Sequence, residues 1–205
     1  MDDYLRAGLA IFNAGQFHAA HDAWEDRWLE LERGSRDERF LHGLIQFTAV
    51  VYHAQDANWD GVCGLAESAV TYLDGLPSDY RTINLDTVRT YLRAVRNDPE
   101  HVERVAPPRL TYDGVVLYPN DLDFDSSAVT AHVLAEEFGY DEWVIERAIG
   151  FARTDLDSGD EGSQFITLIM DFVQESENRG LVFQRLRGHV EKRDSRERDV
   201  DGLFE

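Results

Sequence analysis

The segment from residue 36 to 55 most constrains the fold, because it has the length of a helix but is apolar on almost every face. Its large apolar residues are Phe40, Leu41, Leu44, Ile45, Phe47, Val50, Val51 and Tyr52. A helix that is apolar all round must be covered on several sides by other elements. The rest of the chain has to supply those elements, so the sequence predicts a bundle with residues 36–55 at its centre.

Apolar residues recur with the period of a helix on both sides of this central segment. We expect further helices over residues 4–14, 16–32, 59–75 and 85–97. Ser35 and Glu38 have the spacing of a capping box, which marks the start of the central helix. Short turns join successive helices, and helices joined in this way run antiparallel. Residues 1–98 are therefore predicted to form an all-α, antiparallel helical bundle.

The chain changes character over residues 99–125, which we interpret as a Pro-rich irregular connection. Residues 110–118 have the pattern of a short hairpin around Asp113 and Gly114. Helical periodicity then resumes, and residues 126–205 are predicted to be a C-terminal helical extension. Its expected helices cover residues 126–138, 141–155, 165–173 and 180–193. The charged tail after Lys192 is expected to be mobile, apart from Leu203 and Phe204.

The charge balance bears on the solvent and on the partners of the chain. There are 20 basic and 40 acidic residues, for a net charge of -20, and Lys192 is the sole lysine. Two readings fit, an acidic protein of an ordinary cytosol and a protein of very high salt. We favour high salt, because screening removes the self-repulsion of such a surface. Nucleic acid is not an expected partner, because its binding needs a basic stripe. The main basic stretch, residues 185–198, is interleaved with carboxylates and indicates a solvated helix with salt bridges.

The sequence also gives expectations about the cellular location of the protein and about its cysteine chemistry. The chain begins Met1-Asp2-Asp3, without a basic segment or an apolar run after it. No stretch approaches the roughly 20 apolar residues of a membrane span. Cys63 is the single cysteine, so a disulfide framework or a cysteine-based zinc site is not expected. We expect a cytoplasmic protein that does not contact the membrane.

Polar residues gather on two neighbouring helices of the predicted bundle. One face of residues 16–32 carries four of them at helical spacing, namely His18, His21, Asp22 and Glu25. The central helix carries a second stripe, which consists of His42, Gln46, Ala49 and His53. If the two stripes face each other, His21, Glu25 and Gln46 meet, with His18 and His53 one turn away.

Three interpretations of this polar cluster remain open. The first is a buried hydrogen-bonded network that fixes how the helices pack. The second is a site for a small molecule or a metal ion, with His21, Glu25 and His53 as candidate ligands. The signatures Glu-x-x-His and His-Glu-x-x-His, which are typical of metal sites on helices, are absent. The third is acid–base catalysis without a metal, with His21 as the base and Glu25 orienting it.

The same residues carry a resemblance to a known family. Residues 20–28 read Ala-His-acidic-x-x-Glu-x-x-Trp, followed by Gly-Leu-Ile-Gln at 43–46, Tyr-His at 52–53 and Asn-x-x-Gly at 58–61. This pattern resembles the domain-of-unknown-function 309 family of bacteria and archaea over about residues 8–75, and the acidic composition is that of a haloarchaeal-like member. The resemblance implies a small all-α bundle and no particular reaction. The distinctive residues that it implies are His21, Glu25, Trp28, Gln46 and His53.

From these observations we expect a binding or interaction protein with a polar pocket between the second and third helices. Its binding residues are predicted to be His18, His21, Glu25, Trp28, Gln46 and His53. The alternative is a metal-dependent or acid–base hydrolase-like enzyme that uses His21, Glu25 and His53. No cofactor is predicted, apart from the divalent metal of that alternative. A partner, either a second copy or another protein, is expected to bind the extension, in particular the apolar stripe from Phe165 to Val173.

Overall fold

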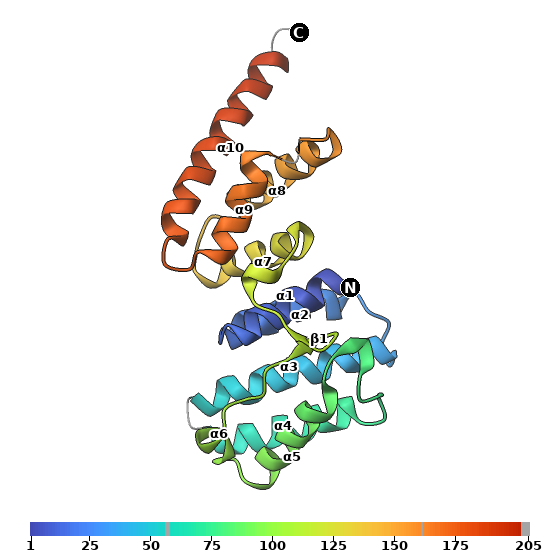
Figure 1. Ribbon diagram of the computed structural model, residues 1–205. Helices are drawn as coiled ribbons and strands as arrows, with labels where there is room; N and C mark the ends of the chain where they lie inside the picture. The colour runs from blue at the N-terminus through green and yellow to red at the C-terminus, as the bar shows by residue number, and fades with distance from the viewer. Residues whose placement is uncertain (56–57, 161, 202–205) are drawn as a thin grey trace. The chain divides into compact units, whose positions relative to one another are not determined.

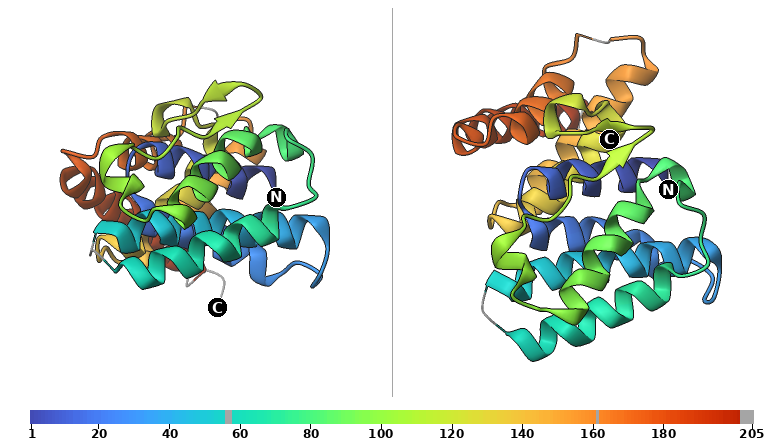
Figure 2. Two further views of the ribbon diagram at one scale, coloured as in Figure 1. Left: turned by 90° about the horizontal axis from the view of Figure 1, so that it is seen from below. Right: turned by 60° about the horizontal axis from the view of Figure 1, so that its bottom comes forward.

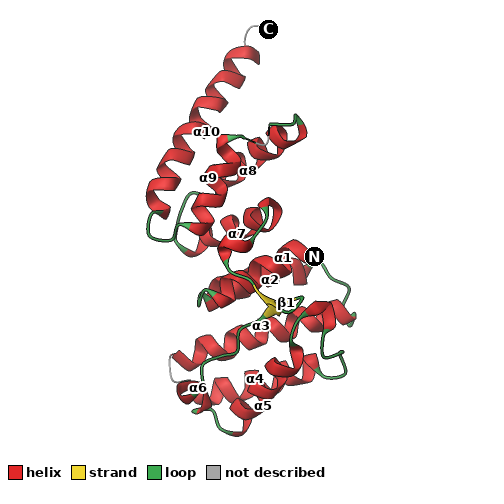
Figure 3. Ribbon diagram, in the orientation of Figure 1, coloured by secondary structure: helices red, strands yellow, loops and turns green. Residues whose placement is uncertain are grey.

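The computed structural model describes residues 1–55, 58–160 and 162–201, and most of these residues are helical, with very little strand (Figures 1 and 3). The prediction of an all-α fold is confirmed. The chain divides into two units, Met1–Leu122 and Asp123–Glu205. Each unit has its own core, and each is described by itself.

Five helices form the body of the first unit: α1 (Asp2–Asn13), α2 (Phe17–Leu29), α3 (Arg36–Gln55), α4 (Trp59–Leu73) and α5 (Leu85–Asn97). Each of them packs against the next one along the chain, and α3 lies between α2 and α4 (Figures 1 and 2). The central position that its apolar sequence predicts is therefore confirmed. The start of α3 is also as predicted, because the Glu38 amide donates to Ser35 Oγ at 3.1 Å. The Glu38 carboxylate accepts in turn from the Gly34 amide at 3.2 Å.

A close approach of α1 to α2 fixes the orientation of α2. The Trp24 side chain is fully buried, and its Nε1 donates to the Leu5 carbonyl at 3.4 Å. The indole lies over Gly8, where a Cβ atom would come within 2.1 Å of Trp24 Nε1. Because Trp24 points into the core in this way, the polar face of α2 is directed elsewhere.

The proline-rich segment after α5 is tied to the first unit. It contains the short helix α6 (His101–Arg104) and a hairpin of β1 (Thr111–Tyr112) and β2 (Val115–Val116). The predicted turn residues Asp113 and Gly114 have φ values of 50° and 76°, as a tight hairpin turn of this type requires. Two 3₁₀ helices, η1 (Tyr80–Thr82) and η2 (Pro119–Asp121), complete the unit.

The buried side chain of Asn13, at the end of α1, forms hydrogen bonds to the residues that flank the two strands of this hairpin. Its Nδ2 donates to the carbonyls of Leu110 and Leu117 at 2.8 and 3.0 Å. Its Oδ1 accepts from the Leu110 amide at 2.9 Å. The division between the units consequently falls after Leu122, so that most of the irregular connection belongs to the first unit.

The second unit contains α7 (Phe124–Glu137), α8 (Glu142–Asp157), α9 (Gln164–Gln174) and α10 (Arg179–Asp201). Helix α9 packs against the other three. Its apolar stripe is buried, and consists of Phe165, Leu168, Ile169, Phe172 and Val173. Our expectation that the stripe from Phe165 to Val173 offers a surface for association is therefore wrong, because the unit uses it for its own core.

Helix α10 runs to Asp201, so the expectation that the last helix ends near residue 193 is wrong. Ion pairs stabilise the added turns. Arg193 Nη1 lies 2.7 Å from Asp155 Oδ1 on α8, and Asp194 accepts from Arg147 on the same helix. Residues Leu203 and Phe204 lie outside the described part of the chain. Within that part, no helix is both long enough and apolar enough to cross a membrane.

Candidate functional site

A cleft of about 380 Å³ lies between α2 and α3 and is the candidate functional site. Its lining from α2 is Phe17, His18, His21, Asp22 and Glu25, and its lining from α3 is Thr48, Ala49, Tyr52 and His53. The two helices run antiparallel, with the His18 ring 5.5 Å from the Tyr52 ring. In an antiparallel pair that turns at Gly34 and Ser35, residues equally far from the turn lie opposite each other, which puts His18 level with about residue 51 and next to Tyr52.

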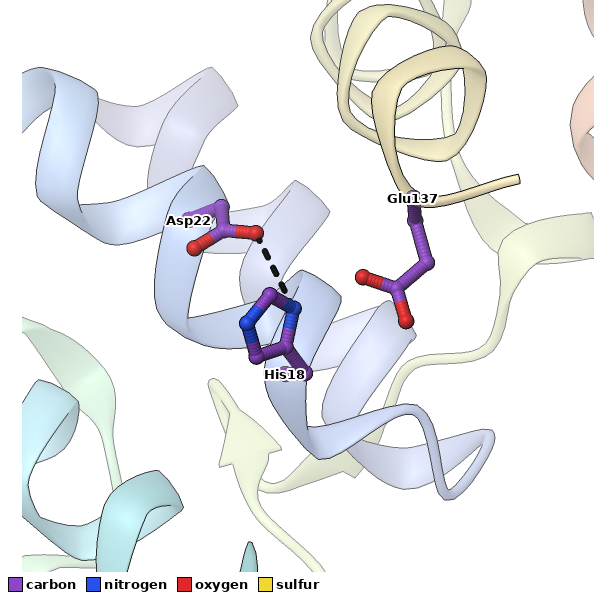
Figure 4. A group of neighbouring side chains, drawn as sticks. All are labelled: His18, Asp22 and Glu137. Atoms are coloured by element: carbon purple, nitrogen blue, oxygen red, sulfur yellow. Dashed lines mark ion pairs between the residues drawn. The ribbon is translucent and has the colours of Figure 1, made fainter. Parts of the chain in front are cut away.

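Two histidine–carboxylate pairs lie one turn apart along α2. His18 Nδ1 is 3.4 Å from Asp22 Oδ2, and Figure 4 shows this pair on the helix. His21 Nε2 is 3.7 Å from Glu25 Oε2. Both pairs have i, i+4 spacing, which places their side chains next to each other on one helix face. The sequence pattern therefore gives a preorganised row of imidazole and carboxylate groups.

This row is open to solvent. The side chains of His21 and Glu25 are 30 % and 45 % exposed. A purely structural network would be sealed, with its polar atoms paired inside the protein. The lining contains two carboxylates and no arginine or lysine. The cleft is thus a solvent-accessible, electronegative hollow.

Three side chains in the cleft are close enough to one another to share a metal ion after small side-chain rotations. The nearest ligand atoms of His21, Asp22 and Glu25 all lie within 4.8 Å of one another. Ligands of a four-coordinate zinc ion with bonds of about 2.1 Å lie roughly 3.4 Å apart. Exposed side chains on one helix face can close that difference by small rotations about their side-chain bonds. His53 lies across the same cleft, on α3.

Helix α3 presents a different face to the cleft from the one that its polar stripe suggests. Ala49 and His53 line the cleft, but Gln46 is half-buried and is not among the lining residues. Thr48 and Tyr52 take part instead. The rotation of α3 about its axis makes this difference, and a sequence pattern alone does not determine that rotation.

Trp28 belongs to a second cluster, at the opposite end of the α2–α3 pair. Its Nε1 donates to Glu38 Oε1 at 3.0 Å, and its ring centroid is 4.6 Å from that of His42. The His42 ring stacks on Tyr72 of α4 at 3.8 Å. These four side chains join α2, α3 and α4, so Trp28 has a packing role in this arrangement.

Sequence reasoning placed the four polar residues of the α2 lining, together with Ala49 and His53, on the two polar stripes, and missed Phe17, Thr48 and Tyr52 as lining residues. Asp22 was placed on the polar face without a role, although it completes the group of close ligand atoms with His21 and Glu25. Its i, i+4 spacing from His18 was the available signal. Neither Thr48 nor Tyr52 gave such a spacing signal, since Thr48 lies outside the polar stripe of α3 and Tyr52 fits its apolar pattern; the signal for Tyr52 was the Tyr-His pair of the family pattern.

The part of the chain that forms the cleft is similar in sequence to a known protein family. Residues 5–65 match the family described as Domain of unknown function (DUF309). The matched segment includes most of α1 and the whole of α2 and α3, and hence all nine residues of the cleft. A protein of Aquifex aeolicus (strain VF5), described as "Uncharacterized protein", is 25 % identical over 111 residues. The alignment covers 54 % of this chain and 32 % of that relative. Neither description names a reaction, and the function of the DUF309 segment is unknown.

Proposed function

We propose that this chain is a binding protein and that the α2–α3 cleft binds a divalent transition-metal ion. The observation that carries the proposal is the group of His21, Asp22 and Glu25, whose ligand atoms lie within 4.8 Å of one another in an open cleft. One imidazole and two carboxylates are a ligand set for zinc, manganese or iron. Three protein ligands leave at least one coordination position for water or for a small molecule.

Electrostatics supports a cation in preference to an anion. Asp22 and Glu25 contribute two negative charges to the cleft, and its lining contains no arginine or lysine. A divalent ion offsets that charge and orders side chains that are otherwise partly exposed. Because each ligand comes from the same helix, binding requires no rearrangement of the bundle.

Metal content and affinity test the proposal. Protein purified without an affinity tag is treated with EDTA and titrated with zinc and with manganese by calorimetry. We expect stoichiometric binding of at least one of these ions, and an affinity about tenfold or more lower in Glu25→Gln. Glu30→Gln is the matched control, because it removes the same charge beyond the end of α2 and outside the cleft. Equal binding by the two variants, or no binding by the wild type, would contradict the proposal.

A metal-dependent, hydrolase-like enzyme is the second candidate, and the room in the cleft favours it. A volume of about 380 Å³ holds a metal ion together with water and a small substrate. A metal-bound water is a nucleophile at neutral pH. In this second proposal His53, which lines the same cleft from α3, exchanges protons with that water. Hydrolysis of p-nitrophenyl acetate by the metal-loaded protein, lost in both Glu25→Gln and His53→Ala, would support the enzyme. Metal binding without hydrolysis would support the binding protein.

We also propose that this protein works in a cytoplasm of high salt concentration. The net charge of -20 supports this part of the proposal. Dissolved salt screens repulsion between exposed carboxylates and so favours the folded state of such a chain. A melting temperature that rises steadily with KCl concentration is the expected result. A melting temperature that does not change with KCl would argue for an ordinary cytosol.

A further inference from the structure

The second unit contains a groove that is lined mainly by basic side chains, whereas the α2–α3 cleft of the first unit contains two carboxylates and no arginine or lysine. It has a volume of about 780 Å³ and lies between the start of α9 and the middle of α10. Its lining is Gln164, Phe165, His189, Lys192, Arg193, Arg196 and Glu197. The lone lysine of the chain and two arginines thus converge on one hollow of a protein whose carboxylates outnumber its basic residues two to one.

Glu197, which lines this groove, and Asp155, which pairs with the lining residue Arg193, are already bound to arginines. Glu197 lies 3.3 Å from Arg147 and 3.6 Å from Arg193. Asp155 lies 2.7 Å from Arg193, and its other oxygen accepts from Ser163 Oγ at 2.5 Å. These bonds leave the negative charge of the groove largely compensated by Arg147 and Arg193.

Two cations of the groove have no such partner. Among the residues that the structure describes, neither Lys192 nor Arg196 takes part in an ion pair. Both side chains are exposed and lie one turn apart on α10, at i, i+4 spacing. The chain as a whole has an excess of acidic residues, but these two unpaired cations give the groove a local positive charge. That charge is available to bind an anion from solution.

We propose that this groove binds a small multivalent oxyanion of the phosphate class. Arginine and lysine bind phosphate oxygens through short, charge-assisted hydrogen bonds, and arginine does so with two parallel bonds. Gln164 and His189 add side chains that can donate hydrogen bonds, and Phe165 adds an apolar side chain to the lining. The net negative charge of the whole chain disfavours a long polyanion such as nucleic acid, whereas a small anion fits within the groove.

Calorimetric titration with inorganic pyrophosphate tests this site in the full-length chain. The protein is first freed of metal with EDTA, so that binding of pyrophosphate to an ion in the α2–α3 cleft does not contribute. Total ionic strength is held constant with KCl, at a concentration at which circular dichroism shows the folded helical spectrum. A second series with citrate asks whether carboxylates replace phosphate.

The variant Lys192→Gln/Arg196→Gln removes the two unpaired charges of the groove. Its matched control is Arg153→Gln/Arg198→Gln, which removes two positive charges from exposed positions of α8 and α10 that do not line the groove. We expect saturable binding of pyrophosphate by the wild type and the control, with affinity reduced about tenfold or more in Lys192→Gln/Arg196→Gln. Absence of saturable binding by the wild type would overturn the proposal. Equal weakening in both double variants would do the same, because it would show a general effect of net charge.

Discussion

Substitution of Gly8 by alanine tests how α2 is positioned. A Cβ atom at residue 8 would lie 2.1, 2.3 and 2.6 Å from three atoms of the Trp24 indole. An ordinary contact begins near 3.4 Å, so the indole or α1 has to move by more than 1 Å. The indole is rigid and fully buried, and its Nε1 donates to the Leu5 carbonyl. A shift of that size therefore strains the core and also breaks a hydrogen bond.

The expected change in the free energy of unfolding is the sum of one stabilising contribution and two destabilising ones. Alanine is favoured over glycine inside a helix by about 1 kcal/mol. Overpacking a well-filled core costs about 1–3 kcal/mol, and loss of a buried hydrogen bond adds about 1 kcal/mol. Gly8→Ala is therefore expected to lower the free energy of unfolding of the first unit by about 1–3 kcal/mol.

Gly64 on α4 offers the matched control, because no atom lies within 4 Å of a Cβ built there. Gly64→Ala gains the helical preference without a clash, and should raise the free energy of unfolding by about 0.5–1 kcal/mol. Urea denaturation followed by tryptophan fluorescence measures both values. A Trp143→Phe background removes the tryptophan of the second unit, so that the signal reports the first unit alone. Shifts of equal sign and size in the two variants would refute the packing argument.

Three further predictions concern ionisable side chains of the first unit that are buried or form ion pairs. The Arg81 guanidinium donates to Asp37 and lowers the pKa of its carboxyl, so Asp37→Asn should reduce the melting temperature at pH 7. That deficit should shrink as acid protonates the wild-type carboxyl, because stability from a lowered pKa is lost as pH falls through the folded value. Burial raises the pKa of Tyr91 to about 12, so stability should fall as pH rises above about 10, where the unfolded phenol ionises. Burial and the hydrogen bond to Asp37 also raise the pKa of Tyr80, so absorbance at alkaline pH should show late tyrosine ionisation whose amplitude Tyr91→Phe reduces but does not abolish. Arg89 is buried and donates to the Leu73 carbonyl at 2.7 Å, so Arg89→Met should cost about 2–3 kcal/mol in urea denaturation.

The order and type of the helices follow directly from apolar periodicity. Residues 36–55 coincide with α3, and the expected helix over 85–97 coincides with α5. Long amphipathic segments with clear end signals are the elements that sequence patterns identify best. The extra length of α10 escaped this reasoning, because it depends on ion pairs such as Arg193 with Asp155, more than 30 residues away in the chain.

The connection after α5 shows why a loop-like composition does not define a boundary. Prolines break helices there as expected, but the segment is bound to the first unit through one buried amide, that of Asn13. An asparagine near the end of an amphipathic helix gives no sequence signal for contacts about 100 residues away. Long-range polar contacts of this kind become visible only in the folded structure.

The site shows a similar limit at the level of helix rotation. Residues on α2 share one face through their spacing, and this is a property of the helix alone. Which residues of α3 oppose them depends on how Trp24 and Gly8 set the rotation of α2 and on how α4 packs on α3. Gln46 and His53 lie on one predicted stripe of α3, yet His53 lines the cleft and Gln46 does not.

The size of the residues that oppose α2 explains why a hollow forms at this end of the helix pair. Ala49 and Thr48 are small and lie opposite the histidine–carboxylate row, so α3 leaves the space between the helices unfilled. At the other end of the pair, the large rings of Trp28 and His42 fill the corresponding space. A chain that needed only a stable helix pair would gain from large apolar residues at both ends. The open end instead combines unfilled volume with two carboxylates and three imidazoles, and this combination supports a binding role for the cleft.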